Sequence, residues 1–175
     1  MTLLRAGLCL LIGTCLACAP QAEEASAPAE VAETVPLLLG YALAVPTVEG
    51  TFVAVDEMFL AGELTSYASG AGSGTLRLLS RPRDWNRHLV FVLELSRVGR
   101  APALYLAALK QSGATFSQLP AIPLGTNRRL IGLRLEAETL SVSTADARLG
   151  KAPASGLDVE AASFVIEAGA LKRLP

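Results

Sequence analysis

The sequence has few of the residues on which most metal and redox sites depend. It contains three cysteines, none of them after Cys18, and a single histidine, His88. Residues 19–175 therefore offer neither a disulfide nor a cysteine-ligated metal, and a domain without cross-links must be held together by its core alone. We expect no cofactor and no metal site.

Motifs for nucleotide binding and hydrolysis are also missing. The glycines of residues 68–74 do not form Gly-x-Gly-x-x-Gly, and the chain has no P-loop. His88 would have to serve as general base for a serine, but none of the candidate serines lies in a Gly-x-Ser-x-Gly elbow. These serines are Ser69, Ser73 and Ser80. We expect a protein that is not an enzyme and does not bind nucleotides. The alternative is a small periplasmic hydrolase or a hydrolase inhibitor.

The net charge excludes a strong general attraction to nucleic acid. The 15 basic and 16 acidic residues leave a charge of -1, so no global field favours a polyanion. The distribution is uneven, because residues 77–134 hold ten basic side chains and only two acidic ones, Asp84 and Glu94. In one interpretation these basic strands pair with acidic strands across a sheet. In the other, a basic face contacts an anionic partner.

The amino-terminal segment has the layout of an export signal. Arg5 precedes an apolar run over residues 6–16, which is shorter than the roughly 20 residues that span a bilayer as a helix. Leu16-Ala17-Cys18 resembles the end of a bacterial lipobox. We therefore predict a lipoprotein signal peptide at residues 1–17 and fatty acylation, such as palmitate, at Cys18.

Three regions are expected: the signal peptide, a lipidated tether over residues 18–45, and a globular domain over residues 46–175. Residues 20–36 are rich in Ala, Glu and Pro and cannot bury enough apolar surface to fold. Residues 37–39 with Tyr41 are a candidate docking point. Ala19, rather than Asp, follows Cys18, which by resemblance to Gram-negative lipoproteins favours sorting to the outer membrane. We expect an exported protein anchored to the cell membrane, in the outer membrane facing the periplasm.

The globular part is expected to be all-β or strongly β-rich. Short apolar runs alternate with Gly, Pro, Asn and Ser, which favours a single small antiparallel β-sandwich or barrel-like domain. Residues 68–74 are expected to be a loop or bulged edge, and residues 97–102 a turn. The run at 103–110 could be a helix instead, because of Ala107 and Ala108. The candidate strands are residues 51–55, 58–60, 75–80, 89–95 and 103–110.

Two hairpins are expected towards the carboxyl end. Apolar and polar residues alternate over 130–136 and again over 140–143, with a slip of phase at 137–139. Such a slip is typical of a tight connection, because each arm must keep its apolar residues on the core face. A second hairpin is predicted around residues 167–169, and residues 151–156 are expected to be a loop.

The order of features resembles a group of small uncharacterised bacterial secreted lipoproteins, over about residues 59–174. The matching stretches are Asp84-Trp85-Asn86-Arg87-His88 with residues 89–95, then residues 104–109, 123–128 and 166–171. The group has no established activity, so the resemblance implies a fold rather than a function. The group's acidic tract could hold a cation, but here only Asp84 and Asn86 remain as oxygen ligands, which argues against a calcium site.

One stretch is a candidate contact surface. Trp85 lies among Arg81, Arg83 and Arg87, and an aromatic ring among guanidinium groups could bind a sugar or an anion. Alternatively, Trp85 covers one end of the core. The leading hypothesis is a non-catalytic binding or adaptor domain, held to the membrane by its lipid anchor. Its candidate partners are an envelope protein, a glycan or an anionic lipid.

Overall fold

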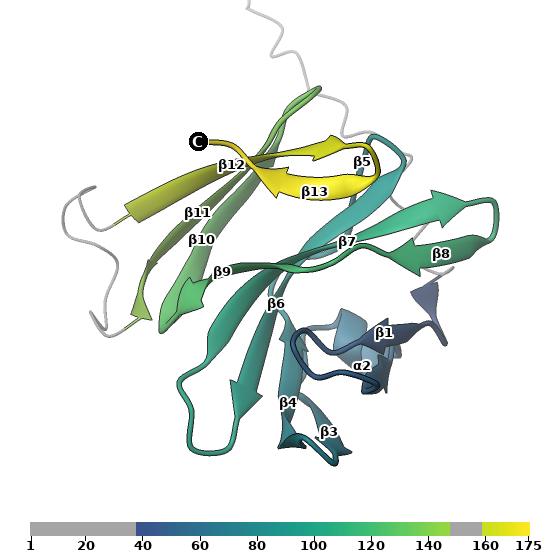
Figure 1. The fold of residues 1–175 in the computed structure, drawn as a ribbon, viewed down its shortest axis with the longest axis vertical. Coiled ribbons are helices and arrows are strands. Elements are labelled where there is room, and N and C mark those ends of the chain that lie inside the picture. The colour runs from purple at the N-terminus through teal and green to yellow at the C-terminus, as the bar shows by residue number, and fades with distance from the viewer. Residues whose placement is uncertain (1–37, 148–158) are drawn as a thin grey trace, which may run out of the picture.

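A computed structural model describes residues 38–147 and 159–175 (Figure 1). The predicted signal peptide, Cys18, residues 20–36 and the expected loop at 151–156 lie outside these described residues. The described chain consists of antiparallel sheets with one short α-helix, as the sequence predicts. None of its helices is long and apolar enough to cross a membrane.

The largest sheet is curled and has seven strands. Its main path runs β3-β4-β6-β7-β8, while β5 pairs with β6 and β9 pairs with β7. The bounds are β3 Thr65–Ser69, β4 Gly72–Leu78, β5 Arg83–Trp85, β6 His88–Arg97, β7 Ala103–Ser112, β8 Thr115–Gln118 and β9 Ile122–Thr126. The runs at 89–95 and 103–110 are therefore confirmed as strands. Ala107 and Ala108 lie opposite Phe91 and Val90 in an extended ladder.

Strands β6 and β7 are buried on both faces. Successive side chains of a strand point to opposite faces, and here Leu89 and Phe91 belong to one hydrophobic cluster while Val90 and Val92 belong to another. This explains why residues 89–95 form a continuous apolar run rather than an alternating one. Figure 1 shows two smaller units on opposite sides of this pair of strands.

The amino-terminal unit covers the first face. It comprises β1 (Ala42–Ala44), β2 (Phe52–Ala54) and α2 (Glu57–Leu60). The Gln118 amide fixes β1 to the large sheet, accepting from the Ala44 N–H at 2.8 Å and donating to the Ala44 carbonyl at 3.1 Å. Leu38 and Leu43 lie in the core, so the expected tether boundary at residue 45 is too late. The folded part includes the candidate docking residue Leu38.

The expected strand at 58–60 is wrong, because these residues form the end of α2. Asp56 is the cause. Its side chain accepts a hydrogen bond from the Phe59 N–H at 2.7 Å, which satisfies a donor that the first turn of a helix leaves free. This cap places Phe59 in the core, where it is 1% exposed.

The carboxyl-terminal sheet covers the second face, in the order β10-β11-β12-β13. The strands are β10 Arg128–Leu135, β11 Leu140–Asp146, β12 Val159–Glu167 and β13 Ala170–Arg173. Both predicted hairpins are confirmed, since Leu135 pairs with Leu140 and Glu167 pairs with Ala170. At the second turn, Ala168 and Gly169 both have positive φ, at 51° and 75°, which is the geometry of a type I′ turn.

Residues 68–74, expected as a loop or a bulged edge, form a tight hairpin between the edge strand β3 and β4, with Ser69 opposite Gly72. Gly74 pairs with Tyr67 across this hairpin and with Arg97 on its other side. A Cβ at Gly74 would overlap the Ser96 carbonyl oxygen and lie 2.7 Å from the Tyr67 Oη. Gly74 is therefore required for the close approach of its neighbours rather than for flexibility.

We expect Gly74→Ala to lower the free energy of unfolding by about 1–3 kcal/mol, because the new methyl group overpacks a backbone contact. Urea denaturation would measure the change. The control is Gly70→Ala in the same hairpin, where a Cβ meets nothing within 4 Å. Equal stability of the two variants would contradict this account of Gly74.

Candidate functional site

Four arginines line one groove between the large sheet and β10. The groove encloses about 510 Å³. We call it the arginine groove and define it by Arg77, Arg81, Arg83 and Arg129. Apolar side chains of β10 and the end of β4 line the same groove. They are Leu79, Leu130, Ile131 and Leu133.

The arginine groove has a single carboxylate among its lining residues, that of Glu94. It accepts a hydrogen bond from Arg77 Nη2 at 2.9 Å, and the two residues are register partners on β4 and β6. The Nε of Arg77 is buried without a hydrogen-bond partner in the described chain. Arg77 thus pairs with the one acidic group, while Arg81 and Arg83 have no carboxylate partner in the described chain and leave the groove positively charged.

The structure separates the four residues of the predicted contact surface. Arg81 and Arg83 are exposed and line the arginine groove, where Arg83 Nη1 donates to the Leu133 carbonyl at 3.3 Å. Arg87 is exposed in the turn between β5 and β6, outside the groove. Trp85 is only 4% exposed. An incoming partner would therefore meet the arginines and not the indole ring.

Trp85 joins the two large layers of the fold. Its indole N–H donates to the Glu136 carbonyl at 2.9 Å, and the Asn86 amide donates to the Ala137 carbonyl at 3.0 Å. The tip of the β5–β6 hairpin therefore holds the tip of the β10–β11 hairpin. The bond from the indole N–H to the Glu136 carbonyl satisfies the one polar group of this buried tryptophan.

Sequence reasoning missed Arg77 and Arg129 as members of the site. Both belong to the basic stretch at 77–134, but no periodicity indicates that residues 77–83 and 129–133 face one another. The two segments meet because the second sheet packs on the first. Composition could only have suggested them as members of an unspecified basic face.

Both interpretations of the basic stretch have support. Arg77 pairs with Glu94 across neighbouring strands, and Arg128 reaches Glu160 across β11 at 2.8 Å. By contrast, several arginines of the stretch have no carboxylate partner in the described chain. These are Arg81, Arg83, Arg87, Arg97 and Arg100.

His88 lies at the start of β6 and is 8% exposed. Its Nδ1 is 2.7 Å from the Asn86 carbonyl oxygen, which can only accept, so Nδ1 carries a proton. The Ser80 hydroxyl accepts from the Val92 N–H at 2.9 Å. Val92 is four residues further along the strand from His88, about 13 Å away. The structure does not bring this serine and the imidazole together.

Residues 38–147 and 159–175 hold no group of three or more His, Cys, Asp or Glu side chains placed to bind a metal ion. No protein family, curated protein or solved structure matches the chain.

We expect Trp85→Ala to cost about 3–5 kcal/mol of unfolding free energy, because it empties a core position and removes the bond between the layers. Chemical denaturation followed by circular dichroism would measure this loss. Arg87→Gly is the matched control in the same turn, because Arg87 has a φ of 64° that glycine adopts without strain. A fully stable Trp85→Ala would show that the indole is a contact residue rather than a core residue.

Proposed function

We propose that this protein is a lipid-anchored component of the bacterial cell envelope, acylated at Cys18 and non-catalytic. Its β-domain would bind an acidic segment of an envelope protein in the arginine groove. The observation that carries the proposal is the charge imbalance there: Arg77 engages the groove's one carboxylate, while the exposed Arg81 and Arg83 have no carboxylate partner in the described chain. The lipobox-like sequence before Cys18 supports the anchor.

The edge of β10 at the groove favours an extended protein segment over a compact anion. In its sheet, β10 has a single neighbouring strand, β11, so a peptide could add along its other side. The register of β10 shifts between Leu130 and Gly132, and Ile131 is 46% exposed at that shift. A peptide at this edge would cover Ile131 and bring its carboxylates to the guanidinium groups, which bind carboxylates through paired hydrogen bonds.

The alternative of a small periplasmic hydrolase or hydrolase inhibitor has weaker support. The His88 imidazole is bonded to the Asn86 carbonyl, and no hydrogen bond joins it to a serine in the described chain. If His88→Ala abolished a measured hydrolytic activity of the native protein, the non-catalytic proposal would fail.

The test is cross-linking in cells followed by co-purification from membranes. We expect a defined acidic envelope protein with the wild-type chain and at least a tenfold weaker yield with Arg81→Gln/Arg83→Gln, because each charged hydrogen bond contributes about 1.5–3 kcal/mol. Arg134→Gln is the control. Arg134 is an exposed β10 arginine that pairs with Glu136 and does not line the groove.

Two further measurements test the lipid anchor and the arginine groove independently. Cys18→Ser should release the protein from membranes and leave the purified domain able to bind the partner. Binding should weaken as salt rises from about 0.1 to 1 M, since the Debye length falls from about 10 to 3 Å. Equal recovery of partner with the double variant and the control would refute the groove, and membrane retention of Cys18→Ser would refute the anchor.

A further inference from the structure

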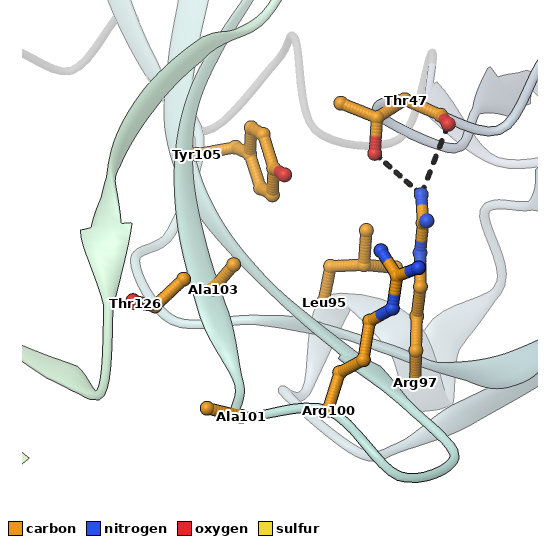
Figure 2. Close-up of a pocket in the computed structure, with 8 residues that line it drawn as sticks. All are labelled: Thr47, Leu95, Arg97, Arg100, Ala101, Ala103, Tyr105 and Thr126. Atoms are coloured by element: carbon orange, nitrogen blue, oxygen red, sulfur yellow. Dashed lines mark hydrogen bonds between the residues drawn. The ribbon is translucent and has the colours of Figure 1, made fainter.

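A second basic pocket lies on the other face of the large sheet. It encloses about 420 Å³, and none of its lining residues lines the arginine groove. Arg97 and Leu95 come from the end of β6, Arg100 from the following turn, and Tyr105 from β7. Thr47, from the connection between β1 and β2, lies across the opening (Figure 2). Among the described residues, none that lines this pocket carries a carboxylate.

Arg97 is held in place but keeps free donors. Its Nη2 donates to the Thr47 carbonyl oxygen at 2.9 Å and also to the Thr47 hydroxyl. Its Nε and Nη1 groups make no hydrogen bond within the described chain. The guanidinium is thus oriented by one residue while most of its donors remain available.

Thr47 is itself strained. Its φ is 61°, a conformation that a β-branched residue rarely adopts. Thr47 is the third residue of a turn over residues 45–48, which the Val48 N–H closes by donating to the Val45 carbonyl at 3.2 Å, and this position of a type II turn requires a positive φ. Here the strained backbone directs both oxygens of Thr47 to Arg97.

Two more polar groups are available at this pocket. The Arg100 guanidinium is exposed and has no hydrogen bond or ion pair within the described chain, and the Tyr105 hydroxyl has no hydrogen bond there either. Figure 2 shows the Tyr105 hydroxyl directed towards the side of the pocket where the two arginines lie. Ala101, Ala103 and the Tyr105 ring supply apolar lining. Thr126 lies beside Ala103, on the side away from the two arginines (Figure 2).

We propose that this pocket binds a small organic phosphate monoester. At neutral pH a phosphate monoester carries a charge of about −1.5 to −2 and three strong acceptor oxygens, which match two guanidinium groups and the phenol. A carboxylate has one charge and two oxygens and would leave donors unused. The apolar lining would contact the organic part, and the volume lies in the range of small-molecule sites. The inference is independent of the arginine groove.

The test uses the full-length chain in detergent and phenyl phosphate as probe, with calorimetric titration as the measurement. We expect saturable binding with a Kd of about 1 mM or below, at least tenfold weaker in Arg100→Gln. The Arg100 side chain makes no hydrogen bond or ion pair within the described chain, and its backbone bond to Arg97 does not depend on the side chain, so this variant should fold as the wild type does. Arg83→Gln, in the arginine groove, is the matched control and should bind normally.

Benzoate and inorganic phosphate test the two halves of the assignment. Both should bind at least fivefold more weakly than phenyl phosphate, because benzoate has only one charge and two acceptor oxygens and inorganic phosphate has no apolar part. No saturable binding of phenyl phosphate, an equal affinity for benzoate or inorganic phosphate, or an unchanged affinity in Arg100→Gln would overturn the proposal. Loss of binding in Arg83→Gln alone would overturn it too.

A flotation arm separates a soluble ester from a lipid headgroup. Phosphatidylcholine vesicles with and without phosphatidic acid would be mixed with wild-type protein and with Arg100→Gln. Both chains carry the same amino-terminal segment, so any difference between them reports on the pocket. If phosphatidic acid captures the wild-type protein but not Arg100→Gln, the pocket is supported and the phosphate monoester it binds is a lipid headgroup. If phenyl phosphate binds but phosphatidic acid captures neither chain, the pocket is supported and the phosphate monoester it binds is a soluble one.

Discussion

The whole fold depends on one pair of strands, β6 and β7, whose two faces are both buried. Because Leu89 and Phe91 point one way and Val90 and Val92 the other, neither face of β6 can be left to solvent. Burial of each large aliphatic side chain contributes about 1.5–3 kcal/mol, so covering units on both sides are required. The amino-terminal unit and the carboxyl-terminal sheet meet this requirement and give the domain three layers.

The two basic sites lie on opposite faces of β6 although their residues are close together in sequence. Glu94 faces the arginine groove, while its neighbour Leu95 lines the second pocket. The arginines of the groove come from β4, β5, the connection between them and β10. Those of the second pocket lie at the end of β6 and in the turn after it. What looks in the sequence like one basic stretch becomes two separate surfaces with different partners in our proposals.

The sequence predicts the strands best where the pattern is long and local. The phase slip at residues 137–139 marks the β10–β11 hairpin because each arm obeys its own period, and the run at 89–95 marks a doubly buried strand. Short signals fail: the apolar residues at 58–60 are too few to outweigh the cap that Asp56 provides. The groove could not be predicted, since Arg129 reaches Arg81 and Arg83 through packing between sheets, which no local period records.

The contacts that close the layers join residues far apart in the chain. Gln118 binds Ala44 across 74 residues, and Trp85 binds Glu136 across 51. Chains dominated by such distant pairings fold slowly, on the millisecond to second scale, because a large loop must close before these distant contacts form. If the chain is exported as we propose, that delay would keep it unfolded while it crosses the membrane, and its layers would be completed only on the far side.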